Sequence, residues 1–139
     1  MSAIFNHINW LAVLVATLAY FILGAIWYSK ALFGMKWAKL VGLNMNSEEK
    51  GKGLGGMLLA SFLLTLITCI ALAILVNRMD LFVLQSGISL GALTGICFAT
   101  TAVAISFIYE SRPLGIYFID CGYHVVGHIV AAVILVLWR

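Results

Sequence analysis

Three ionisable side chains recur at intervals of four residues near the end of the chain: Asp120, His124 and His128. On an α-helix, each step of four residues rotates only about 40° beyond a full turn. The three side chains would therefore form one polar stripe, with Tyr117 on or beside the same face. Because imidazole titrates near neutral pH and binds metals, the stripe is a candidate proton relay, solute pathway, or metal or haem site.

The stripe also has a purely structural interpretation, in which it supplies hydrogen bonds between helices. Asp120 would then pair with Arg112 or a facing tyrosine, and the histidines with Ser or Thr hydroxyls of the preceding helix. The metal interpretation is the weakest. Tight sites take ligands from several helices, whereas His124 and His128 share one. The spacing specifies no cofactor.

The surroundings of the stripe are those of a membrane protein. Of the 139 residues, 64% are hydrophobic and only 9% are charged, which is more apolar surface than a soluble domain of this length can bury. A helix crosses the bilayer with about 20 mostly apolar residues. The sequence therefore predicts an all-α integral membrane protein, a single membrane domain over residues 1–139 with its helices in an up-down bundle. The four predicted transmembrane helices span about residues 8–29, 55–76, 83–109 and 114–138.

Two packing expectations follow from this layout. The polar turn at residues 77–80 is short, so the second and third spans are expected to pack together as a tight hairpin. An unpaired ionisable side chain at membrane depth costs at least about 2.5 kcal/mol. The polar stripe of the fourth span should therefore face the interior of the bundle.

Basic residues predict the orientation in the membrane. Six of the eight Lys and Arg residues lie on the face of the first and third loops, and two lie on the opposite face. The positive-inside rule then places these loops in the cytoplasm and both termini outside. Membrane topology accounts for the net charge of +3, so no nucleic-acid partner is predicted. The basic residues of the first and third loops are Lys30, Lys36, Lys39, Lys50, Lys52 and Arg112, and those of the opposite face are Arg78 and Arg139.

The first loop, residues 30–54, is the only sizeable segment outside the predicted spans. Apolar side chains alternate with lysines in its first half, which predicts a short amphipathic helix in the cytoplasmic interface. Residues 46–49 read Asn-Ser-Glu-Glu, typical of a helix N-terminus, and the glycines at 51–56 indicate a hinge or a flexible segment. The apolar side chains are Phe33, Trp37, Leu40 and Val41.

Acidic and basic side chains meet where the third span ends. Glu110 and Arg112 lie there, beside Tyr28 and Lys30 at the start of the first loop. This cytoplasmic corner is either a gate or binding site, or an ion pair that sets topology and contributes little energy.

The third span carries Gly87, Gly91 and Gly95, a repeated pattern of small residues that lets another helix approach closely. The partner is either a helix of the same bundle or one of a second protomer. Because four short helices bury limited area, we expect a homo-oligomer.

Three cysteines fall inside apolar stretches and lack the spacing of a disulfide or zinc framework. Cys69, Cys97 and Cys121 are therefore predicted to be small buried hydrophobic residues.

Aromatic and Arg-Pro signatures recur at the ends of the spans. They are Asn9-Trp10, Trp27-Tyr28-Ser29, Leu32-Phe33-Gly34 with Trp37, Glu110-x-Arg112-Pro113-Leu114 and Gly122-Tyr123-His124. Over nearly the whole chain, this set resembles the small bacterial membrane proteins grouped as domain of unknown function 1761. The resemblance implies a four-span protein of the bacterial inner membrane and no particular activity. Ala31 departs from the pattern, which would have proline there and a sharper turn.

The leading functional hypothesis is proton-linked or small-solute transport through the site of Asp120, His124 and His128. The alternative is a non-transporting subunit that docks an unidentified membrane partner through the glycines of the third span. A metal- or haem-binding membrane protein comes third. An enzyme is disfavoured, because the sequence contains no evident nucleophile–base pair or phosphate loop.

Overall fold

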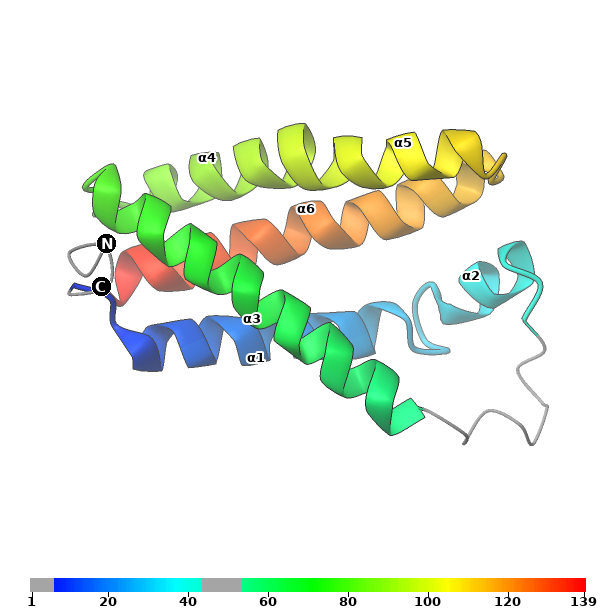
Figure 1. Cartoon of the computed structure of the whole chain (residues 1–139), viewed down its shortest axis with the longest axis horizontal. Coiled ribbons are helices and arrows are strands. Elements are labelled where there is room, and N and C mark those ends of the chain that lie inside the picture. Colours follow the sequence, from blue (N-terminus) through cyan, green and yellow to red (C-terminus); the bar gives the residue numbers. More distant parts are fainter. Residues whose placement is uncertain (1–6, 44–53) are drawn as a thin grey trace.

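The computed structural model describes residues 7–43 and 54–139, and within these ranges every regular element is helical. The first two helices are α1 (Trp10–Trp27) and the short α2 (Gly34–Leu40). The others are α3 (Leu54–Arg78), α4 (Leu84–Thr94), α5 (Thr101–Tyr109) and α6 (Leu114–Leu137), with one π-helical turn, Gly95–Thr100, joining α4 to α5 (Figure 1).

The predicted fold class is confirmed. Four helices are long and apolar enough to cross a membrane: α1, α3, α6 and the continuous run Leu84–Tyr109 made by α4, the π turn and α5. Their ends lie within two residues of the predicted bounds. The short helix expected after the first span is α2. The helix start expected at residues 46–49 and the first glycines of the expected hinge lie outside the described residues.

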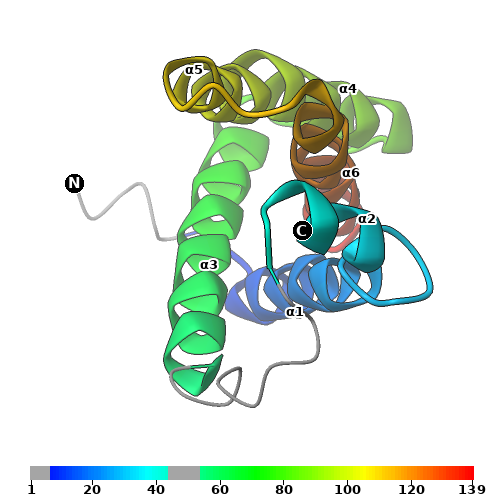
Figure 2. The ribbon, with the colours of Figure 1, turned by 90° about the vertical axis from the view of Figure 1, so that its right-hand side faces the viewer.

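α6 is the central helix of the bundle. It packs against α1, α3 and α4, and 44% of its most apolar stretch is buried, compared with 22–28% in the other spans. Figure 1 shows α6 between α1 on one side and α4–α5 on the other, while α3 crosses the bundle obliquely. Seen end-on, α3 extends from the level of α4 and α5 to that of α1 (Figure 2).

Small residues bring α4 and α6 close together. A Cβ atom at Gly87 would lie 3.0 Å from the Cα atom of Val133, and one at Gly95 would lie 2.8 Å from the Cα atom of Val125. At Gly91, between them, the added atom would collide with the backbone of Ile129. The glycine face of the third span thus lies against α6 of the same chain. That surface is not available to a second protomer or another protein.

The expected hairpin of the second and third spans is wrong. The turn between α3 and α4 is short, but the two helices make few contacts with each other: α4 packs on α6, whereas α3 packs on both α1 and α6. All the buried residues of α3 lie in its C-terminal half: Cys69, Leu72, Ala73 and Val76. A short turn fixes only the distance between two helix ends. The packing surfaces offered by α1 and α6 decide the angle at which the helices leave it.

The ends of α1 and α6 are joined at the end of the bundle that carries both termini. Asn9 caps α1 by accepting a hydrogen bond from the backbone N–H of Ala12, and its amide donates to the backbone oxygen of Trp138, 3.1 Å away. Arg139 then binds Asp80 of the α3–α4 turn at 2.8 Å. These contacts fix the register in which α1 and α6 present their polar side chains to each other.

The prediction for the cysteines is confirmed at two positions and wrong at the third. Cys69 and Cys121 are buried, whereas Cys97 is exposed on the π turn. A thiol behaves as a small hydrophobic group, and in a membrane span such a group is as well placed against lipid as in the core.

Candidate functional site

One hydroxyl group on α1 joins the two histidines of α6. The Tyr20 oxygen lies 3.0 Å from Nδ1 of His124 and 3.1 Å from Nδ1 of His128. Tyr20 and His128 are 3% and 8% exposed, so the cluster is in the bundle interior. The structural interpretation expects Ser or Thr partners from the preceding helix. That expectation is wrong, because α6 turns its histidines toward α1.

The directions of these hydrogen bonds follow from their acceptors. A carbonyl oxygen can only accept, so His128 must donate from Nδ1 to the backbone oxygen of His124, 2.7 Å away. The Tyr20 hydroxyl has one proton and two acceptors on His124, Nδ1 at 3.0 Å and the backbone oxygen at 3.4 Å. We assign the proton to the closer Nδ1, which is then unprotonated. Neutral His128 is therefore the Nδ1–H tautomer, and neutral His124 is the Nε2–H tautomer.

Gly127 makes room for the Tyr20 ring. A Cβ atom at this position would collide with three carbon atoms of that ring. The ring is enclosed and contacts Tyr123 and His128 at centroid distances of 5.3 and 5.7 Å. It therefore has no simple way to move aside.

We expect nitrogen NMR of histidine-labelled protein in nanodiscs to show one Nδ1–H and one Nε2–H neutral tautomer at mildly alkaline pH. Gly127→Ala should displace the Tyr20 ring and convert the His124 signals into a mixture of tautomers. Gly122→Ala is the matched control, because its added Cβ atom would approach only the edge of the Trp27 ring, at 3.3 Å. An Nδ1–H tautomer at His124 in the unaltered protein would contradict this arrangement.

Asp120 is paired with Tyr28, which links two groups that the sequence places in separate candidate sites. The Tyr28 hydroxyl donates to Oδ1 of Asp120 at 2.8 Å. The Trp27 indole N–H donates to the backbone oxygen of Ile119 at 3.0 Å and ties the end of α1 to α6. A facing tyrosine is one of the two partners expected for Asp120.

The other corner residues do not join this pair. Arg112 and Glu110 form an ion pair at 2.7 Å with both side chains largely exposed, so its contribution to stability is small. Lys30 is exposed, and no ion pair involves it among residues 7–43 and 54–139. Of the four residues predicted for the corner, only Tyr28 reaches the polar stripe.

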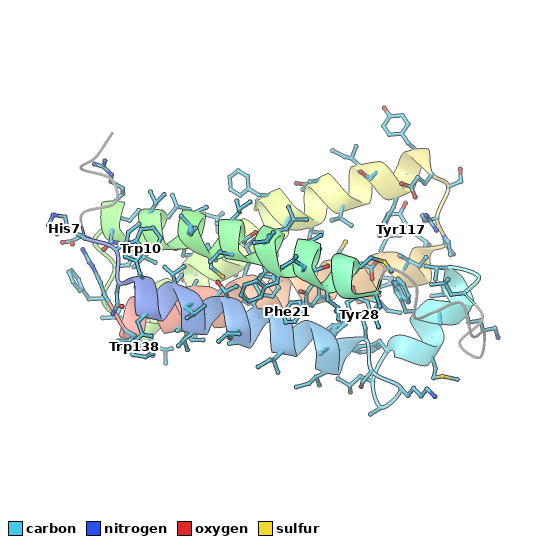
Figure 3. The ribbon with its side chains drawn as sticks, turned by 60° about the horizontal axis from the view of Figure 1, so that its bottom comes forward. His7, Trp10, Phe21, Tyr28, Tyr117 and Trp138 are labelled. Atoms are coloured by element: carbon cyan, nitrogen blue, oxygen red, sulfur yellow. The ribbon has the colours of Figure 1, made fainter. Side chains whose placement is uncertain are left out.

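Tyr117 lies on a different side of α6. Its ring packs against Phe107 of α5, with centroids 5.3 Å apart. Figure 3 shows Tyr117 on the side of α5, and Tyr28 near the end of α1. A rotation of about 60° separates positions three residues apart on a helix, which is enough to place Asp120 against α1 and Tyr117 against α5.

A cavity of about 200 Å³ adjoins the histidine cluster between α1, α3 and α6. Sequence reasoning missed most of its polar lining. A usable signal was present, because Ser61, Thr65 and Thr68 recur at helical spacing within a Leu-rich span. The lining residues are Tyr20, Ser61, Leu64, Thr65, Thr68, Tyr123 and His124.

Between this cluster and the end that carries the termini, the core is mostly apolar, and the buried Thr17 donates its hydroxyl proton to its own helix, at the backbone oxygen of Val13. Ala16, Ala131 and Ala132 are 0% exposed, and Leu72 and Val76 pack in the same core. The polar groups thus begin at mid-membrane and continue toward the loop end through Tyr123, which contacts both Tyr20 and Tyr28 at centroid distances of 5.3 and 5.5 Å.

The histidines are poorly arranged for a metal. Within the described ranges, no three His, Cys, Asp or Glu side chains gather in a way that could hold an ion. The Nδ1 atoms of both histidines are already hydrogen-bonded to Tyr20.

Comparison with known proteins gives one match. The profile of a family described as "Protein of unknown function (DUF1761)" matches residues 11–136, which confirms the resemblance drawn from the span-end signatures. Neither curated proteins nor solved structures include a match to the chain.

Proposed function

We propose that this chain, which belongs to the DUF1761 family of proteins of unknown function, is a transporter whose Tyr20–His124–His128 cluster passes a proton across mid-membrane. The observation that carries the proposal is the Tyr20 hydroxyl between two Nδ1 atoms, at 3.0 and 3.1 Å. Hydrogen-bonded histidines and hydroxyls inside a membrane are typical of proton relays.

The two tautomers define how a proton moves. His128 accepts a proton on Nε2 and releases its Nδ1 proton to the Tyr20 oxygen. Tyr20 passes its own hydroxyl proton to Nδ1 of His124, and His124 releases its Nε2 proton toward the cavity. One proton enters and one leaves, which leaves His128 as the Nε2–H tautomer and His124 as the Nδ1–H tautomer. Each ring then resets on its own side: after rotation exposes it, the ring gains a proton from water on one nitrogen and loses one to water from the other, with no net transfer. From these starting tautomers the transfer runs from the terminus end toward the loop end, and a gradient of the opposite sign reverses it.

The surroundings of the relay support a coupled carrier rather than an open proton channel. Its neighbours are Tyr123 on α6 and Cys69 on α3, while Asp120 and Tyr28 form a separate pair. The apolar core closes the terminus side of His128, so that side must open in a second conformation. A carrier that alternates between two such states couples proton movement to that of a solute.

We place the protein in the bacterial inner membrane, as the family resemblance implies, with both termini outside, as the distribution of Lys and Arg predicts. The proposed proton movement is then inward. A docking role has less support, since the glycine face of α4 is occupied by α6.

The test is proton flux into proteoliposomes, followed with an internal pH dye under an imposed potential. Flux is measured first without solute and then with small solutes added outside, because a coupled carrier moves protons together with its solute. We expect flux above that of protein-free vesicles, and its loss when both His124 and His128 are changed to Ala in a protein that remains folded. The variant Lys36→Ala, altered at an exposed residue of α2, serves as the control and should retain flux. Should the unaltered protein be indistinguishable from protein-free vesicles, the relay as proposed would be wrong.

A further inference from the structure

The cavity beside His124 has hydrogen-bonding groups whose directions are already fixed. The Thr65 hydroxyl donates to the backbone oxygen of Ser61 at 2.8 Å, and the Thr68 hydroxyl donates to that of Leu64 at 3.2 Å. Each of these hydroxyl groups therefore donates its one proton to a backbone oxygen of its own helix. At Thr65 and Thr68, α3 thus offers the cavity acceptor oxygens, and the Ser61 hydroxyl lines it as well.

The opposite wall offers a donor. Because Nδ1 of His124 accepts from Tyr20 at 3.0 Å, the neutral ring carries its proton on Nε2. His124 therefore has an N–H left to donate. The cavity thus combines a donor on α6 with acceptors on α3 across a space of about 200 Å³.

The lining carries no formal charge while His124 is neutral. Its seven residues are tyrosines, hydroxyl residues, one leucine and His124. Asp120 is held by Tyr28 and is not among them. An ion without a countercharge is strongly disfavoured at membrane depth. For an uncharged molecule, the free-energy cost of entering comes only from polar groups that lose their hydrogen bonds to water and find no partner in the cavity.

We propose that this cavity binds a small uncharged molecule that carries a hydrogen-bond acceptor and an N–H or O–H donor, as a primary amide does. Its acceptor takes the Nε2–H of His124, and its donors bind the oxygens of Thr65 and Thr68. The cavity is open past the exposed side chains of Ser61 and Leu64, and its volume of about 200 Å³ suits a molecule of a few heavy atoms. The inference rests on the proposed function, because it names the class of solute that the same site would carry.

Saturation-transfer NMR with acetamide tests this in nanodiscs at mildly alkaline pH. We expect transfer to the acetamide methyl group, and none to acetate or methylammonium, which have similar size but carry a charge. The double change Thr65→Val and Thr68→Val keeps the side-chain shape and removes both acceptors, so affinity should fall about tenfold. The matched control is Thr101→Val, because Thr101 also bonds its own helix at 2.8 Å but lies outside the cavity.

Absence of transfer to acetamide, or equal transfer to the charged analogues, would overturn the inference. So would unchanged acetamide binding in the double variant. If that variant fails to fold, the single changes Thr65→Val and Thr68→Val each make the same comparison. Binding and proton flux are separate measurements: acetamide binding without flux contradicts only the relay, and flux without acetamide binding contradicts only this ligand class.

Discussion

Replacing Gly91 with alanine is expected to destabilise the protein by about 3 kcal/mol, the upper part of the usual range for overpacking. The added Cβ atom would collide with the backbone of Ile129 and lie 2.7 Å from the backbone oxygen of His128. Backbone atoms cannot rotate away as a side chain can, so α4 and α6 would have to separate. The expected result is a marked loss of stability in SDS-titration or thermal unfolding in detergent, followed by circular dichroism.

Gly56 provides the matched control for this change. It lies in α3 with no neighbouring atom within 4 Å of an added Cβ atom, so alanine there is expected to be neutral or stabilising by at most about 1 kcal/mol. The two variants differ from the parent by the same methyl group in a membrane-spanning helix. Equal unfolding curves for both would contradict the close approach of α4 and α6.

Replacing Tyr20 with phenylalanine is expected to lower proton flux about a hundredfold, near the lower end of what a positioned proton-transfer group contributes. The ring, which is 3% exposed, keeps its packing, and only the oxygen between the two Nδ1 atoms is removed. His128 retains its hydrogen bond to the backbone oxygen of His124, whereas Nδ1 of His124 loses its donor. Flux of the pH dye in proteoliposomes measures the effect.

Tyr109→Phe is the control for the Tyr20 variant. Tyr109 is the last residue of α5 and is 87% exposed. Removing its hydroxyl group should leave the proton flux unchanged. Leaving His124 Nδ1 without a partner should also cost about 1–3 kcal/mol of stability. The flux is therefore compared at a temperature where both variants are folded. Full flux in Tyr20→Phe would exclude the tyrosine from the relay even if the histidines prove essential.

The composition of the sequence was enough to predict the membrane environment and the spans. A hydrophobic run as long as the bilayer is thick, with charged residues at its ends, can hardly be placed anywhere but across the membrane. Every span accordingly lies within two residues of its predicted bounds. The spacing of Asp120, His124 and His128 also placed them on one side of one helix. These are local properties, fixed by helix geometry and by the cost of placing charge in hydrocarbon.

The partners of those residues were decided by tertiary structure. Tyr20 precedes His124 by more than one hundred residues, and nothing local to either indicates that they meet. The contact arises because α6, with small residues on several sides, accepts α1 and α4 at close range and becomes central. The same packing separates Tyr117 from the stripe, gives the glycine face of α4 a partner within the chain, and directs α3 away from α4.

The sequence by itself thus determined which segments cross the membrane and which polar side chains enter it. Tertiary structure alone decided that the histidines face a tyrosine of α1, that Asp120 pairs with Tyr28, and that hydroxyls of α3 border a cavity beside His124. The physical reason is that burial in a bilayer depends on the composition of each segment. The choice of neighbour depends on how closely two helix surfaces fit, which no single segment encodes.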